Sequence, residues 1–131
     1  MAETGAMDHE DRFSGLVIGA AIEVHRHLGP GFLESVYEIA LVTELELRKI
    51  QVARQVAIPI SYKGHLVAES RLDLLIENEL VVELKSVESL SAVHTAQVVS
   101  YLRAGAFEVG LLINFNVAVL RNGIRRVVLS P

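Results

Sequence analysis

A short polar turn between two apolar stretches constrains the fold of this chain more than any other feature. Residues 66–76 and 80–86 have the composition of strands, and only Glu77-Asn78-Glu79 separates them, which predicts a tight antiparallel hairpin. Asp73 and Glu83 each lie five residues from the middle of that turn. Simple pairing therefore places the two carboxylates opposite each other, with Cβ atoms about 5 Å apart. A bulge at the turn would shift this register by one residue.

Two carboxylates at that separation repel each other, so the hairpin needs something that compensates their charge. One candidate is a divalent cation, because the hard oxygen ligands of carboxylates suit Mg²⁺ or Mn²⁺. Another is Lys85, which shares a strand face with Glu83 because side chains alternate along a strand. A third interpretation needs no cation and makes these residues a salt-bridged strand face in contact with water.

The rest of the chain has an order of helices and strands typical of an α/β domain. Apolar residues recur at helical spacing before and after Gly29-Pro30-Gly31, and Asn122-Gly123 is a strong signal for a hairpin turn. Pro59 favours an edge position for the strand that contains it. The expected helices cover residues 13–28, 33–48 and 91–104, and the remaining expected strands cover residues 52–62, 109–114, 117–121 and 124–129.

Composition narrows the class of protein further. The chain has 131 residues and no cysteine, which excludes a disulfide scaffold, a thiolate zinc site and a cysteine nucleophile. Its formal net charge is −4, and most of that charge falls in residues 1–12, which we expect to be an acidic, disordered tail before a single domain of residues 13–131. No stretch is apolar for long enough to cross a membrane and no secretory signal is visible, so we expect a cytoplasmic protein with no membrane partner.

Three groups of residues resemble a known family. Asp73 followed by Glu83-Leu84-Lys85 is similar to the D…ExK signature of the PD-(D/E)XK nuclease superfamily. The segment from Gly31 to Tyr37, GFLESVY, resembles the motif that names the GxxExxY family, a small branch assigned to that superfamily. Gln97-Val98-Val99-Ser100-Tyr101 is similar to the Q-x-x-x-Y motif of RecB-like nucleases. The resemblance covers nearly the whole chain outside the acidic tail.

The resemblance implies a fold with an αβββαβ core, here with an extra N-terminal helix and a C-terminal β-hairpin. It also implies that Lys85 orients or helps to deprotonate a water molecule, and that Gln97 and Tyr101 position the substrate. A Mg²⁺ or Mn²⁺ ion would polarise the scissile phosphate. Its implied ligands are Glu34, Asp73, Glu83 and the carbonyl oxygen of Leu84.

On this resemblance we expect a metal-dependent nuclease that hydrolyses phosphodiester bonds in nucleic acid, in DNA rather than RNA. The alternative is a catalytically idle module of the same fold that binds nucleic acid or a protein. The small size of the chain favours that alternative, because little chain remains outside the core for a dedicated DNA-recognition element. A further possibility is a homo-oligomer that forms through the Asn122-Gly123 hairpin or the strand containing Pro59.

Overall fold

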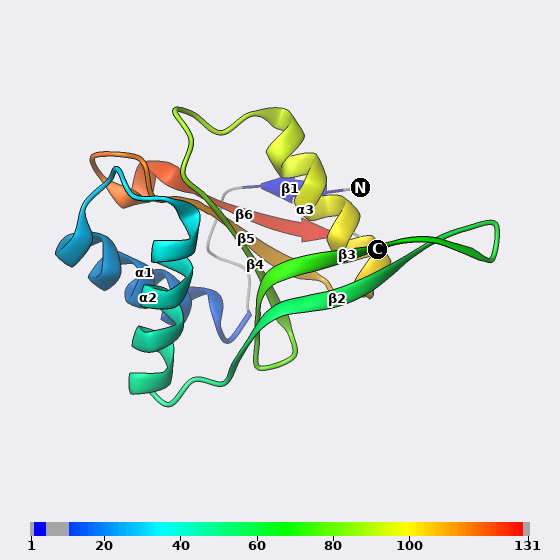
Figure 1. The fold of residues 1–131 in the computed structure, drawn as a ribbon, viewed down its shortest axis with the longest axis horizontal. Coiled ribbons are helices and arrows are strands. Elements are labelled where there is room, and N and C mark those ends of the chain that lie inside the picture. The colour runs from blue at the N-terminus through cyan, green and yellow to red at the C-terminus, as the bar shows by residue number, and fades with distance from the viewer. Residues whose placement is uncertain (1, 5–10, 130–131) are drawn as a thin grey trace.

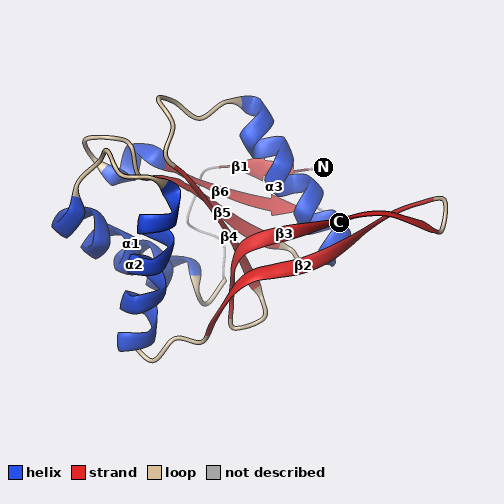
Figure 2. Cartoon of the chain, viewed as in Figure 1, coloured by secondary structure: helices blue, strands red, loops and turns tan. Residues whose placement is uncertain are grey.

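The computed structural model describes residues 2–4 and 11–129, which form one mixed sheet with helices on both faces (Figure 1 and Figure 2). The sheet has six strands in the order β1-β6-β5-β4-β3-β2. The strands are β1 (Ala2–Thr4), β2 (Val52–Tyr62), β3 (His65–Ile76), β4 (Leu80–Lys85), β5 (Val109–Asn114) and β6 (Ile124–Leu129). The helices are α1 (Ser14–Leu28), α2 (Glu34–Leu47) and α3 (Ala92–Gly105), with a 3₁₀ turn, η1, at Leu120–Gly123. None of the helices in these described ranges is long and apolar enough to span a membrane.

Among the described strands only β4 and β5 run parallel, and α3 makes the crossover between them. Both strands are buried almost throughout, which explains their near-continuous apolar sequences. The helices α1 and α2 pack on one face of the sheet and α3 packs on the other (Figure 1). The predicted αβββαβ order is therefore confirmed, with α1 as the extra N-terminal helix.

The sheet divides the hydrophobic core into two halves. Side chains of α1 and α2 meet Leu74, Val82 and Ile113 on one face, and side chains of α3 meet Leu75 and Val81 on the other. Successive residues of a strand thus enter different halves, as alternation requires. Each fully buried aliphatic side chain stabilises the fold by about 1.5–3 kcal/mol, so both halves hold the sheet in place.

One predicted strand is wrong. Residues 117–121 do not form a strand, and η1 occupies the position of the expected hairpin turn. A type I′ turn at Asn122-Gly123 needs positive φ at both residues, and neither residue has it. Gly123 instead passes so close to Asn114 that an added Cβ would lie 2.2 Å from the Asn114 carbonyl oxygen. β6 pairs antiparallel with β5 itself, so the two strands form the C-terminal hairpin through a longer connection.

The N-terminal segment is joined to the last strand of the sheet. Ala2–Thr4 form β1, which pairs antiparallel with β6; the other residues of the expected tail up to residue 10 lie outside the described residues. The Asp11 carboxylate accepts hydrogen bonds from the Ser14 N–H (2.7 Å) and from Arg126 Nε–H (2.8 Å). Burial alone would raise the pKa of Asp11, but the hydrogen bonds from Ser14 and Arg126 lower it, so this ion pair fastens the chain to β6.

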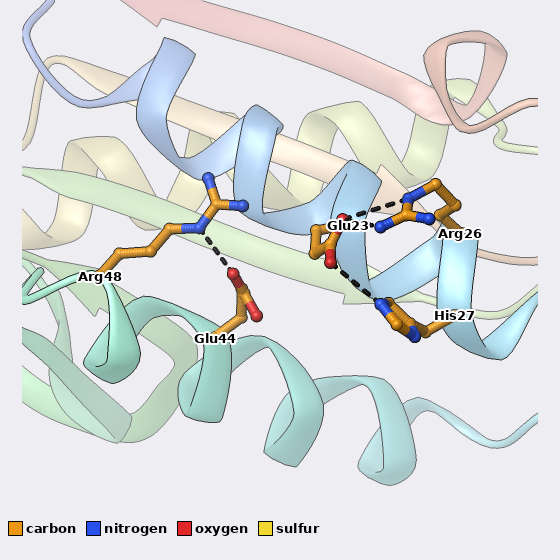
Figure 3. Close-up of polar contacts among 5 residues, drawn as sticks. All are labelled: Glu23, Arg26, His27, Glu44 and Arg48. Carbon is orange, nitrogen blue, oxygen red and sulfur yellow. Dashed lines mark hydrogen bonds and ion pairs between the residues drawn. The ribbon is translucent and has the colours of Figure 1, made fainter.

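Charged side chains form pairs within α1 and at the end of α2 (Figure 3). Glu23 contacts Arg26 at 2.7 Å and His27 at 2.9 Å, and Glu44 contacts Arg48 at 2.7 Å. These are pairs of residues three or four apart on one helix, which contribute about 0.2–0.5 kcal/mol each. These pairs support the two helices and give these five residues partners within the chain.

Candidate active site

The loop before α2 is fixed by Tyr37, which is fully buried. The Tyr37 hydroxyl donates a hydrogen bond to the Gly29 carbonyl oxygen (2.6 Å) and accepts one from the Phe32 N–H (3.1 Å). Its ring stacks on Phe115, with 4.4 Å between the ring centroids. Tyr37 is therefore a structural residue, and the loop that it holds determines where Glu34 begins α2.

A second set of contacts ties that loop to the end of β4. Ser86 follows β4 directly, and its hydroxyl donates a hydrogen bond to the Phe32 carbonyl oxygen (2.6 Å). Asn114, at the end of β5, accepts a hydrogen bond from the Val87 N–H (3.1 Å) and donates one to the Val87 carbonyl oxygen (3.0 Å). The start of α2 is thus held beside the carboxyl end of β4, with the Glu34 side chain exposed to solvent.

Asp73 and Glu83 lie against each other, as the short turn predicts. The regular β3–β4 ladder ends at the pair formed by Leu74 and Val82. One step further, the Asp73 N–H donates to Glu83 Oε2 (2.8 Å) and the Leu84 N–H donates to Asp73 Oδ2 (2.8 Å). The two carboxylates therefore take the place of the backbone hydrogen bonds that would continue the ladder. We call these two residues the carboxylate pair.

Burial makes the carboxylate pair hard to ionise. Glu83 is only 3% exposed, and this burial together with the charge of Asp73 raises the pKa of its carboxyl to about 8. Burial also raises the pKa of Asp73; the hydrogen bond from the Leu84 N–H opposes that effect, and the charges of Glu38 and Glu34 add to it. At neutral pH the pair therefore retains a proton unless a cation compensates its charge.

The strand that carries Asp73 changes face at that residue. Leu72 packs in the α3 half of the core and Leu74 in the α1–α2 half, although residues two apart on a regular strand share a face. Gln55 lies across from Asp73 on β2 and has a φ of +51°. The residues on either side of Gln55 pair with Leu72 and Leu74, whereas Gln55 and Asp73 do not pair. We call this irregularity the kink; it frees Asp73 from the regular ladders on both sides, and such distortions are common next to functional sites.

Glu38 holds the kink, and none of the sequence motifs includes it. Glu38 is only 6% exposed, and its carboxylate accepts hydrogen bonds from Gln55 Nε2 (3.0 Å) and Arg54 Nε (2.9 Å). Glu38 lies one helical turn after Glu34, and residues four apart share a helix face. That spacing is the signal that could have identified it, because a second acid one turn beyond a candidate ligand faces the same region.

Gln97 and Tyr101 lie on α3, on the sheet face opposite α2. Gln97 Nε2 donates to the Tyr101 hydroxyl (3.1 Å), while Gln97 Oε1 is buried without a hydrogen-bond partner in the part of the chain that the structure describes. Glu83 points to this same face, because Val81, two residues earlier on β4, packs against α3. The glutamine thus presents an unused acceptor on the side of the sheet where Glu83 lies.

The predicted metal ligands suit a divalent cation chemically but are not gathered around one point. Between residues 11 and 129, no three Asp, Glu, His or Cys side chains lie close enough to share one metal ion. Glu34 stands within electrostatic range, because its charge contributes to the raised pKa of Asp73 and of Glu83. The positive charge of Lys85 lowers the pKa of both carboxyls. The two carboxylates of the pair are hard oxygen donors of the kind that Mg²⁺ and Mn²⁺ prefer.

Comparison with known proteins places this arrangement in a family. No curated protein and no solved structure matches the chain. A family model of the PD-(D/E)XK nuclease superfamily matches residues 11–127, which include all three helices and the carboxylate pair. Because this match spans most of the sequence, the chain belongs to the PD-(D/E)XK nuclease superfamily.

Proposed function

We propose that this protein is a nuclease that uses Mg²⁺ or Mn²⁺ to hydrolyse phosphodiester bonds in nucleic acid, in DNA rather than RNA. The observation that carries the proposal is the carboxylate pair, in which Glu83 is buried, Asp73 is half-buried and each carboxylate accepts a backbone N–H from the other strand. Two like charges held close together in a partly buried place destabilise a fold. A site that binds a cation needs such negative charges as ligands, so their presence points to a function. Membership of a nuclease superfamily supports the same function.

In this proposal Asp73, Glu83 and the carbonyl oxygen of Leu84 hold the cation, and Glu34 completes the set from the start of α2. When bound, the ion supplies a Lewis acid that polarises the scissile phosphate. Glu34 is exposed at the first turn of α2, so its carboxylate can turn toward the pair without opening the core. Glu38 remains with its partners on β2 and keeps the kink in place.

Lys85 acts on the substrate in this proposal. It lies two residues beyond Glu83, one pleat further on the same strand face, and it is only partly buried. An ammonium group there offsets the negative charge that develops on the phosphoryl oxygens and can hold the attacking water. Gln97 accepts a hydrogen bond from that water or from the substrate through its unpartnered Oε1, and Tyr101 fixes the amide.

We also propose that the chain belongs to the GxxExxY branch of the superfamily. Each of the three residues that name this branch has a separate physical role here. Gly31 has a φ of +111°, a conformation that other residues rarely adopt. Glu34 opens α2, and Tyr37 fixes the loop that leads to it. Together they support an acid at a defined position beside β4.

Single-turnover cleavage tests the proposed activity. Single- and double-stranded DNA and RNA of one sequence are incubated with Mn²⁺ and the wild type, Glu83→Gln or Glu79→Gln, the last being a matched change at an exposed acid in the β3–β4 turn. We expect the wild type and Glu79→Gln to cut DNA at equal rates, and Glu83→Gln to be slower by at least about 10²-fold. If Glu83→Gln cut DNA at the wild-type rate, the cleavage would come from another protein in the sample. No cleavage of any substrate by the wild type would favour the idle binding module.

A further inference from the structure

The strands β2 and β3 continue beyond the rest of the sheet as a two-stranded arm, which we define as residues 59–71. Figure 1 shows the arm projecting away from all three helices, and Figure 2 shows that it is strand almost to its tip. The two strands stay paired from Ala57↔Arg71 to Tyr62↔His65, with one register shift at Ile60/Ser61. Every residue from 61 to 69 is exposed to solvent.

The arm exposes apolar side chains that its own fold does not cover. Tyr62, Leu66 and Val67 are 61%, 69% and 58% exposed. A two-stranded ribbon without a third strand or a helix against it is marginally stable in water. Exposed apolar side chains that gather on one projecting element are typical of a contact surface.

The charge of the arm indicates a negatively charged partner. Lys63 and Arg71 are both exposed, and in the described ranges neither forms an ion pair with an acid. Glu69 is the only acid in the arm, and His65 stands beside Lys63 at the tip. The arm therefore has a cationic excess in a chain whose formal net charge is −4.

The position of the arm connects this surface to the carboxylate pair. Continuing the β3–β4 register from Leu74↔Val82 puts Lys85, the last residue of β4, level with Arg71. The arm thus begins where β4 ends, and its tip at His65 lies eight residues before Asp73, or about 26 Å at the rise of a strand. A partner that lies along the arm reaches the carboxylate pair at its root.

We propose that the arm binds double-stranded nucleic acid and places the backbone of the duplex at the carboxylate pair. A two-stranded ribbon fits the major groove of a duplex, and Lys63 and Arg71 are spaced to meet phosphates at two points along it. A second copy of this chain is disfavoured, because two arms packed antiparallel about a two-fold axis would bring Lys63 of each toward Arg71 of the other. The claim that the bound duplex is the substrate rests on the proposed nuclease function. The claim that the arm binds a duplex does not depend on that function.

Fluorescence anisotropy in EDTA, where cleavage cannot interfere, tests the arm directly. Labelled double-stranded DNA and a single strand of the same length are titrated with the wild type and with Lys63→Glu/Arg71→Glu. The matched control is Arg12→Glu/Lys49→Glu, which makes the same charge change at two exposed residues away from the arm. Melting curves check that each variant is folded.

We expect Lys63→Glu/Arg71→Glu to weaken duplex binding at least tenfold and to reduce the slope of log Kd against log salt by about 2, since two phosphate contacts are lost. The control should change binding less than threefold, and Tyr62→Ser/Leu66→Ser should weaken duplex binding without changing that slope. Equal weakening by the arm variant and the control would overturn the proposal. So would tighter binding of the single strand, or a wild-type dimer in light scattering that Tyr62→Ser/Leu66→Ser converts to monomer.

The binding titration in EDTA and the cleavage assay in Mn²⁺ together test the arm and the nuclease function independently. Duplex binding that depends on the arm, without cleavage in Mn²⁺, would support the arm and contradict the proposed function. Cleavage in Mn²⁺ with full duplex binding by Lys63→Glu/Arg71→Glu would support the nuclease and overturn the arm.

Discussion

Folding moves the Glu83 carboxyl from water into the sheet. Its pKa is about 8 in the folded protein against an ordinary value of 4.5, because burial and the Asp73 charge disfavour ionisation. Between these two values the folded protein binds more protons than the unfolded chain. The free energy of unfolding must therefore fall as the pH rises from about 4.5 to about 8, by at most about 1.4 kcal/mol per pH unit for one proton.

This dependence can be measured by urea denaturation in EDTA at several pH values from 5 to 8. We expect the wild type to lose stability steadily over that range. Glu83→Gln should show a much flatter profile, because its amide cannot ionise. The same slope in both proteins would mean that another group titrates.

Asp73 gives a second test of the carboxylate pair. Asp73→Asn removes one of the two charges but keeps an oxygen that can accept the Leu84 N–H (2.8 Å in the wild type). We expect this variant to melt at a higher temperature than the wild type in EDTA at pH 8. Asp73→Ala, which also loses the acceptor, should not share this gain. A lower melting temperature for Asp73→Asn would indicate that Asp73 is held in a structural ion pair with Lys85 or Arg71.

A substitution at Lys85 distinguishes a role in catalysis from a role in folding. Lys85→Met keeps the apolar stem and removes the ammonium group, so we expect nearly unchanged melting and Mn²⁺ affinity. Single-turnover cleavage should fall by about 10²–10³-fold, the usual cost of losing one group that stabilises transition-state charge. If Lys85 only neutralises the carboxylate pair, the variant will instead melt lower in EDTA and cleave at nearly the wild-type rate in saturating Mn²⁺.

At the scale of elements, the kink between β2 and β3 determines where Asp73 points. Gln55 has a φ of +51° and is held by Glu38 from α2. A β-branched residue in that conformation costs on the order of 1–3 kcal/mol, whereas glycine adopts it freely. Gln55→Val and Gln55→Gly both lose the hydrogen bond to Glu38, so we expect Gln55→Val, which also strains the backbone, to lower the free energy of unfolding and weaken Mn²⁺ binding more than Gln55→Gly does.

Urea denaturation and calorimetric titration with Mn²⁺ test these expectations for both Gln55 variants. Gln51→Val is the control, at an exposed residue next to the same strand. Gln51→Val should behave as the wild type. Equal effects of valine and glycine at position 55 would show that the side-chain bond to Glu38 matters and the backbone conformation does not.

The sequence predicted these elements unequally well. Apolar periodicity identified the helices, and apolar runs bounded by turn residues identified the strands β2 to β6. The prediction of a strand at residues 117–121 was wrong because Asn122-Gly123 is compatible with both a hairpin turn and a close approach of two backbones. In the structure Gly123 closely approaches the backbone of Asn114. The kink had no signal, since Gln55 is not a residue that usually marks positive φ.

At the scale of the whole molecule, the arm is what the sequence could not predict. The stretches 52–62 and 66–76 were expected as strands, but Tyr62, Leu66 and Val67 have the composition of core residues and are exposed. Burial depends on what else packs nearby, which a single sequence does not reveal. The structure therefore adds a candidate recognition element to a chain whose small size argued against one.

The carboxylate pair was predictable because it depends on local geometry. Its register follows from a three-residue turn, and both acids stand out against apolar neighbours. Glu38 was missed because its role comes from contacts with Arg54 and Gln55, which are distant in the sequence. The four-residue spacing from Glu34 could have indicated that Glu38 faces the same region, but its contacts with Arg54 and Gln55 need the tertiary structure.

Calorimetric titration with Mn²⁺ at pH 7 tests the central claim most directly, in two buffers that differ in ionisation enthalpy. If the carboxylate pair binds the cation, the wild type will bind Mn²⁺ saturably and will release protons, because Glu83 with a pKa of about 8 must ionise to become a ligand. The heats will then differ between the two buffers. Glu83→Gln will bind no Mn²⁺, and Glu79→Gln will behave as the wild type. The account is contradicted if Glu83→Gln binds Mn²⁺ with the wild-type affinity, or if the wild type binds none.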